Sequence, residues 1–103
     1  MVILDDVKRR AWLTHAIEDT VERVYVCKAR SLCEAEGQLL RDPGFEALFI
    51  SGEFGLEAVA RFVETARKLS SARSAAFVLV LREQLGTDLM AKHLLVGINA
   101  FLV

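Results

Sequence analysis

Short apolar runs alternate along the chain with longer segments of helical period. The apolar runs are rich in β-branched residues and are the expected strands, at 2–4, 24–27, 47–50, 76–81 and 100–103. The third and fourth runs are continuously apolar, which is typical of strands whose sheet is covered by helices on both faces. Strands that alternate with helices predict repeated βα units around a parallel sheet.

The first two segments between these runs carry helix signals. The segment at about 7–18 is amphipathic, and its apolar stripe includes Trp12, which we therefore expect in the core. The next helix should begin at Ser31, which forms a capping box with Glu34, and end before the turn signal at 42–44.

The other two helices are expected nearer the end of the chain. Apolar residues at helical spacing predict a third helix over 56–69. A fourth should begin at about Thr87 or Asp88, either of which could cap it, and continue to Val96 with Gly97 as its stop.

Composition narrows the class of protein. The 103 residues suit one domain, 1–103, and the 53% hydrophobic share favours a sheet covered on both faces or a surface covered by a partner. A net charge of −1 favours neither nucleic acid nor an anionic membrane as a partner. No run approaches the roughly 18 apolar residues of a membrane span, and the start lacks a secretory leader. We therefore expect a cytoplasmic location.

The cysteines and histidines do not suggest a metal site. Cys27 and Cys33 do not form a disulfide framework, and with only two histidines the chain lacks the paired spacing of a zinc site. We expect both cysteines to be buried thiols. His15, in the first helix, and His93, in the fourth, are expected at the surface.

The order of elements, starting with a strand that ends in an acidic pair, resembles the receiver domain of bacterial response regulators. Three stretches carry this resemblance: Leu4-Asp5-Asp6, the run 29–35 that enters the second helix, and the run 97–102 that leads into the last strand. The resemblance implies an α/β, flavodoxin-like, doubly wound fold with five parallel strands in the order 2-1-3-4-5. It also implies that the family's fifth helix is absent from this segment.

The family's phosphoacceptor position is where the sequence departs most. The resemblance implies an aspartate at the end of the third strand, but this position falls on Ser51, or on Gly52 if the register slips by one. A serine without an activating base is a poor nucleophile toward phosphoryl donors, so the simpler interpretation is a strand-to-loop turn. Glu53 would then be either a solvated loop residue or a built-in mimic of the acyl phosphate.

The rest of the implied site is also incomplete. In the family, the acidic pair would hold a divalent cation, so the resemblance implies at most weak Mg²⁺ binding by Asp5 and Asp6 and no other cofactor. One of these aspartates could equally cap the first helix, and the two roles can coexist. The family's hydroxyl switch falls on Leu81 or Arg82, neither of which has a hydroxyl. Its lysine would follow Val103.

Together these departures predict a pseudo-receiver, which is not an enzyme and acts as a phosphorylation-independent protein-interaction module in bacterial two-component signalling. A first alternative is a phosphoryl-accepting receiver that uses Ser51 or Glu53, with a cation on Asp5 and Asp6. A second is an unrelated flavodoxin-like domain that binds a small ligand at the strand ends, although the sequence has no glycine-rich phosphate loop.

Two surfaces are expected to meet partners. Receivers generally use the fourth helix with the fifth strand, which here would present Leu89, Met90, Lys92, His93 and Phe101 to a histidine kinase or an output domain. Alternatively, the two apolar helix residues simply pack on the sheet. The face left bare without a fifth helix predicts a homodimer, or a further C-terminal segment that covers it.

Overall fold

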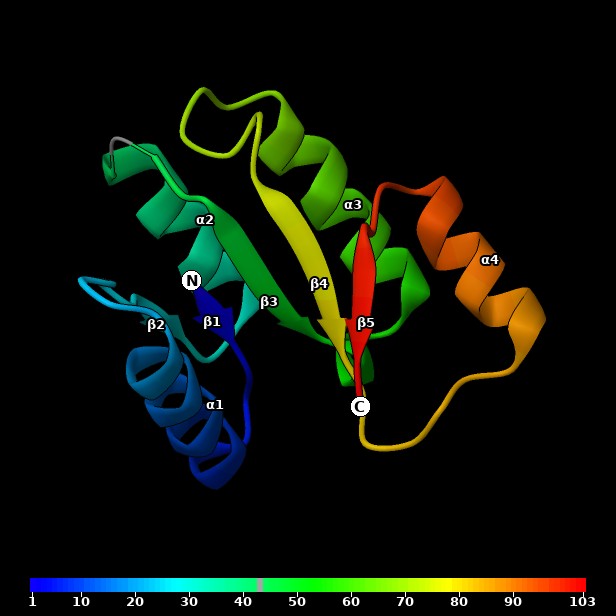
Figure 1. Cartoon of the computed structure of the whole chain (residues 1–103). Coiled ribbons are helices and arrows are strands. Elements are labelled where there is room, and N and C mark those ends of the chain that lie inside the picture. Colours follow the sequence, from blue (N-terminus) through cyan, green and yellow to red (C-terminus); the bar gives the residue numbers. More distant parts are fainter. Residues whose placement is uncertain (43) are drawn as a thin grey trace.

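A computed structural model of the chain describes residues 1–42 and 44–103. Its five strands form one parallel sheet in the order β2-β1-β3-β4-β5, which confirms the predicted flavodoxin-like α/β fold (Figure 1). The strands are β1 Val2–Ile3, β2 Lys28–Ala29, β3 Ala47–Ser51, β4 Ala76–Val80 and β5 Ala100–Leu102. The helices are α1 Val7–Thr20, α2 Leu32–Arg41, α3 Leu56–Arg67 and α4 Thr87–Leu95, with a short 3₁₀ helix η1 at Gly52–Phe54.

The two faces of the sheet are covered unequally. Alternate strand side chains such as Ile50 and Phe77 point into a large core that α2 and α3 share. The opposite face has a much smaller buried cluster, formed by Val2, Leu4, Leu13 and Val80. Figure 1 shows α1 alone on this side of the sheet, with α2, α3 and α4 on the other.

The less covered face of the sheet contains a groove. It has a volume of ≈ 860 Å³ and lies between α1 and the exposed part of the sheet. Apolar side chains of the strands, including Phe49 and Leu102, line its floor, and Ile17 of α1 lines its wall. We call this region the bare face.

The second strand is not where the apolar run predicted it. The prediction of 24–27 was wrong, because β2 is formed by Lys28 and Ala29, which pair with Val2 and Ile3. β-branched residues signal a half-buried surface more than a hydrogen-bonded ladder. Val26, within the predicted run, packs partly against the smaller core cluster without belonging to a strand.

The burial expected for four side chains was also wrong, in one case only in part. Trp12 is 65% exposed, because Leu13 and Thr14 are the buried residues of α1. Cys33 is exposed on α2, and Cys27 is only partly buried. His93 is 2% exposed, since its ring lies against Phe101 and its Nδ1 atom is 2.9 Å from the carbonyl oxygen of Leu89.

Helix ends follow the predicted signals in part. The Ser31 hydroxyl accepts the N–H of Glu34, as the capping box predicts. The fourth helix has Gly86 at its N-cap instead of Thr87 or Asp88, and it makes no side-chain cap bond. Gly97, with φ of 112°, ends that helix as predicted. The turn predicted at 42–44 includes Pro43, which lies outside the described residues.

The amino ends of β4 and β5 are held together by Arg67, at the end of α3. Its guanidinium donates to the carbonyl oxygens of Arg73 (3.2 Å), Ala75 (2.8 Å) and Gly97 (3.3 Å). It also donates to Asn99 Oδ1 at 3.2 Å. The same guanidinium lies 4.2 Å from the centre of the Phe77 ring. A single side chain thus fixes α3 to the segments that enter two strands.

Candidate functional site

Three charged side chains meet at the carboxyl ends of the strands. Asp6 lies between β1 and α1, Glu53 lies in η1 directly after β3, and Arg82 follows β4. Parallel strands place their carboxyl ends at one edge of the sheet, which is where open α/β sheets bind ligands. The topology therefore brings together residues that are far apart in the sequence, and we call Asp6, Glu53 and Arg82 the ion triad.

Arg82 is the centre of the ion triad. Its Nη2 atom lies 3.0 Å from Asp6 Oδ2, and its Nε atom lies 2.6 Å from Glu53 Oε1. The three side chains are partly exposed to solvent, so each ion pair is screened and stabilises the fold only weakly. The geometry places one guanidinium between two carboxylates, so half of their negative charge is offset from within the chain.

Asp6 has a second role as the N-cap of α1. Its Oδ1 atom accepts the backbone N–H groups of Arg9 at 3.2 Å and Lys8 at 3.0 Å. The hydrogen bond from Arg9 is the main reason that the pKa of Asp6 is lowered from 3.8, and the bond from Lys8 and the charge of Arg82 act in the same direction. The expectation that one of the two aspartates caps the first helix is thus confirmed for Asp6. Asp5 is exposed.

The position equivalent to a phosphoacceptor is enclosed. Ser51 is 0% exposed, and its hydroxyl accepts the N–H of Glu53 at 3.2 Å. Gly52 is just as constrained, because a Cβ atom added there would lie 2.6 Å from Leu81 Cδ2. An acidic side chain at position 52 therefore has no space unless Leu81 moves. Both residues form the turn from β3 into η1.

The donor atoms do not fit a divalent cation in this arrangement. Mg²⁺ needs free oxygen ligands in near-octahedral geometry. Both carboxylate oxygens of Asp6 are already engaged, and Arg82 would have to leave before a cation could approach Oδ2. Within 1–42 and 44–103, no group of three His, Cys, Asp or Glu side chains is placed to hold a metal ion. The weak cation site expected at Asp5 and Asp6 remains a prediction.

The residues expected to meet partners on α4 and β5 do not form one exposed surface. Leu89 and Lys92 are exposed, whereas Met90 and Phe101 are partly buried. His93 points inward, and its buried Nε2 atom has no hydrogen-bond partner among the described residues. Further along α4, Leu95 is 86% exposed, and it was not among the expected contacts.

All three residues of the ion triad are among the positions predicted from the sequence, but the pairing of Arg82 with the two carboxylates is not. Arg82 is predicted at the switch position, and Glu53 is linked to Asp6 only in the alternative of a phosphoryl-accepting receiver. A usable signal was present, since a basic residue after β4 lies at the same edge as acidic residues after β3 and β1 once the strand order is known. The pairing of Arg82 with both carboxylates is therefore a finding of the structure.

Comparison with known proteins supports the fold. No protein-family model matches the chain. No curated protein matches it either. Among solved structures, the chain is similar to a response regulator from Thermotoga maritima, with a TM-score of 0.82 and 17% sequence identity. The similarity covers 99% of this chain and 80% of the other. Among the described residues, no helix is long and apolar enough to cross a bilayer.

Proposed function

We propose that this chain is a pseudo-receiver, a signalling module that acts by protein contact without being phosphorylated. The similarity in fold to a response regulator supports the signalling class. The observation that carries the proposal is Arg82, whose guanidinium lies between Asp6 and Glu53. It supplies a fixed positive charge at the edge of the sheet where a receiver would bring a cation and a phosphoryl group.

The surroundings of Ser51 support the same proposal. A phosphoryl donor must reach a nucleophile, and the hydroxyl of Ser51 is fully buried. None of the described hydrogen bonds joins Ser51 to a general base that could activate it; its hydroxyl accepts the N–H of Glu53 instead. The competing function, a receiver that accepts a phosphoryl group on Ser51 or Glu53, needs both Arg82 and the turn to rearrange.

The test is an NMR titration of backbone amides with magnesium and then with beryllofluoride, a mimic of the acyl phosphate. We expect no saturable shifts around Asp6, Ser51 or Glu53 in the wild type at millimolar magnesium. Arg82→Gln should bind magnesium measurably, because it exposes two carboxylates that no longer have a cation between them. Arg73→Gln, which removes an exposed charge elsewhere, is the control. Saturable beryllofluoride shifts in the wild type would overturn the proposal.

The bare face is the contact surface that this proposal favours, and its occupant is a second copy of the chain. Side chains of the floor, such as Phe49, are apolar, which is typical of homodimer interfaces. Tyr25, which lines the groove, is 89% exposed. Arg23 and Glu46 also line it, so a two-fold related copy can place opposite charges together. A histidine kinase or an output domain would then use the remaining surface of α4 and β5.

Sedimentation of the wild type and of Val78→Lys tests the dimer. Val78 of β4 is the register partner of Phe49 in the groove floor, and its side chain is only partly buried, so a lysine there places a charge beside the bare face. We expect a dimer that becomes a monomer in this variant. Thr65→Lys, on the exposed side of α3, should remain a dimer. A wild type that stays monomeric at high micromolar concentration would contradict the proposed interface.

A further inference from the structure

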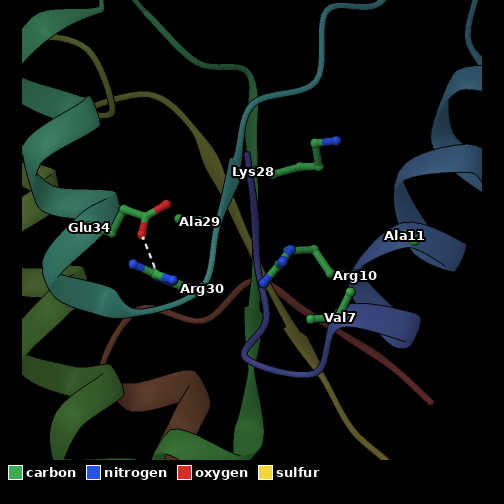
Figure 2. Close-up of a pocket in the computed structure, with 7 residues that line it drawn as sticks. All are labelled: Val7, Arg10, Ala11, Lys28, Ala29, Arg30 and Glu34. Carbon is green, nitrogen blue, oxygen red and sulfur yellow. Dashed lines mark ion pairs between the residues drawn. The ribbon is translucent and has the colours of Figure 1, made fainter.

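A second concave site lies between α1 and α2, beside the edge strand β2 (Figure 2). It has a volume of ≈ 460 Å³, within the range of small-molecule pockets, about 300–1,000 Å³. None of its residues belongs to the ion triad. The residues that line it are Val7, Arg10, Ala11, Lys28, Ala29, Arg30 and Glu34.

The lining of this pocket is strongly basic. Three cationic side chains, Arg10, Lys28 and Arg30, face it with a single carboxylate, that of Glu34. Glu34 pairs with Arg30 at 3.3 Å; the Arg30 side chain is largely exposed and that of Glu34 is partly exposed. The pocket therefore has an excess of two positive charges, although the chain as a whole has a net charge of −1. Such a local excess attracts a small anion with about two negative charges.

The basic groups are positioned from different elements. Arg10 comes from α1, and its Nη1 atom donates to the carbonyl oxygen of Leu4 at 2.8 Å, which holds the guanidinium in place. Figure 2 shows Lys28 and Arg10 between the strands and α1, and the Arg30–Glu34 pair on the side of α2. A guanidinium held by one bond keeps further N–H donors in a planar fork that suits phosphate.

Beside Arg10, the wall formed by α1 is apolar. Val7 and Ala11 lie one turn apart on this helix. The Val7 side chain is exposed to solvent, and the residues before and after it in the chain are charged. The pocket thus offers a nonpolar contact beside a cluster of cations, which is more than an inorganic anion needs.

We infer that this pocket binds a small phosphomonoester of mononucleotide size. Its phosphate lies among Arg10, Lys28 and Arg30, and its nonpolar part lies against Val7 and Ala11. A phosphomonoester carries about −1.5 to −2 charges at neutral pH, which matches the excess of two positive charges. This binding does not depend on the proposed function, because it uses neither the ion triad nor the bare face.

Calorimetric titration of the full chain with adenosine monophosphate at low salt is the direct test. We expect saturable binding that weakens as salt is added, and much weaker binding of adenosine, which lacks the phosphate. Lys28→Gln should weaken binding about tenfold by removing one charged contact. Lys68→Gln, the same charge change at the end of α3, should have no effect.

Glu34→Gln provides a test in the opposite direction. Removing the carboxylate that pairs with Arg30 should tighten binding about threefold, a gain that a damaged fold would not give. Three results would overturn the inference: no binding at millimolar nucleotide, equal losses in Lys28→Gln and Lys68→Gln, or inorganic phosphate binding as tightly as the nucleotide.

Discussion

Two arginines occupy opposite ends of the same sheet and are used differently. Arg67, at the amino ends of β4 and β5, donates to four neutral oxygens and lies over the ring of Phe77. Arg82, at the carboxyl end of β4, pairs with two carboxylates that solvent also reaches. Both carry one positive charge and make several contacts, so the difference lies in their partners.

The loss of Arg67 and the loss of Arg82 should have different consequences. Backbone carbonyls at the end of a helix and before two strands would lack partners without Arg67, so its loss leaves polar groups unsatisfied. The carboxylates beside Arg82 can return to water, so its loss costs little stability but changes the charge at the carboxyl edge of the sheet. We therefore expect the amino end to control stability and the carboxyl end to control recognition.

The largest effect on stability should come from Arg67→Ala. We expect it to lower the free energy of unfolding by about 3 kcal/mol, because several charged hydrogen bonds and a cation–π contact are lost together. Arg67→Lys should recover only part of this loss, since a single ammonium group cannot reproduce the planar fork. Urea unfolding of both variants, with Arg73→Ala as the control, measures the difference. Equal midpoints for all three variants would contradict the structural role of Arg67.

The next largest difference in stability is expected between alanine substitutions of one glycine at each end of the sheet. Gly97 has φ of 112°, and an added Cβ would lie 2.8 Å from Val63 Cγ1, so Gly97→Ala should cost about 2 kcal/mol. Gly52→Ala should cost about 1 kcal/mol, because the closest atom is the end of the flexible Leu81 side chain. Thermal unfolding of the two variants gives the ranking, and a costlier Gly52→Ala would show that the turn after β3 is the more rigid one.

Arg82→Gln should change stability much less than either substitution at the amino end. We expect a loss of about 0.5 kcal/mol or less, because both of its ion pairs are partly exposed. The check is a urea unfolding curve measured in the same series as Arg67→Ala. A loss close to that of Arg67→Ala would mean that the ion triad is part of the structural framework.

The smallest effect concerns the pH dependence given by Asp6. Its pKa is lowered in the folded chain from 3.8, so its stabilising contribution is present above that value and is lost as pH falls through the folded pKa. Asp6→Asn keeps a capping side chain but removes the charge, so the variant should be slightly less stable at neutral pH and equal to the wild type in strong acid. Urea midpoints across this range measure it, and a difference that is independent of pH would contradict the role of the charge.

The sequence was most informative where periodicity and chain order determine the structure. The continuous apolar runs of β3 and β4 identified the centre of the sheet, and the helical spacing of 56–69 identified α3 to within two residues at its end. It was least informative about β2, because Val26 satisfies the pattern of a strand while packing without a ladder. Periodicity reports burial, whereas pairing depends on which backbone groups lie beside β1.

The candidate site could be predicted only as separate positions. Asp6, Glu53 and Arg82 were each identified, but their contacts depend on the side-chain directions set by the turns after three strands. The buried position of His93 was missed for a related reason, since its contact with Phe101 joins a helix to a strand. The basic pocket was missed because Arg10, Lys28 and Arg30 come from segments with no shared motif.

The exposed ring of Trp12 has a practical consequence. It is the single tryptophan of the chain, and it lies one helical turn before Ala16, which lines the groove of the bare face. Indole emission shifts to shorter wavelength when water leaves the ring, so the tryptophan fluorescence of an unlabelled sample reports whether Trp12 becomes covered. The emission wavelength of Trp12, measured as the protein alone is diluted, would then show whether the groove is filled, before any partner has been isolated.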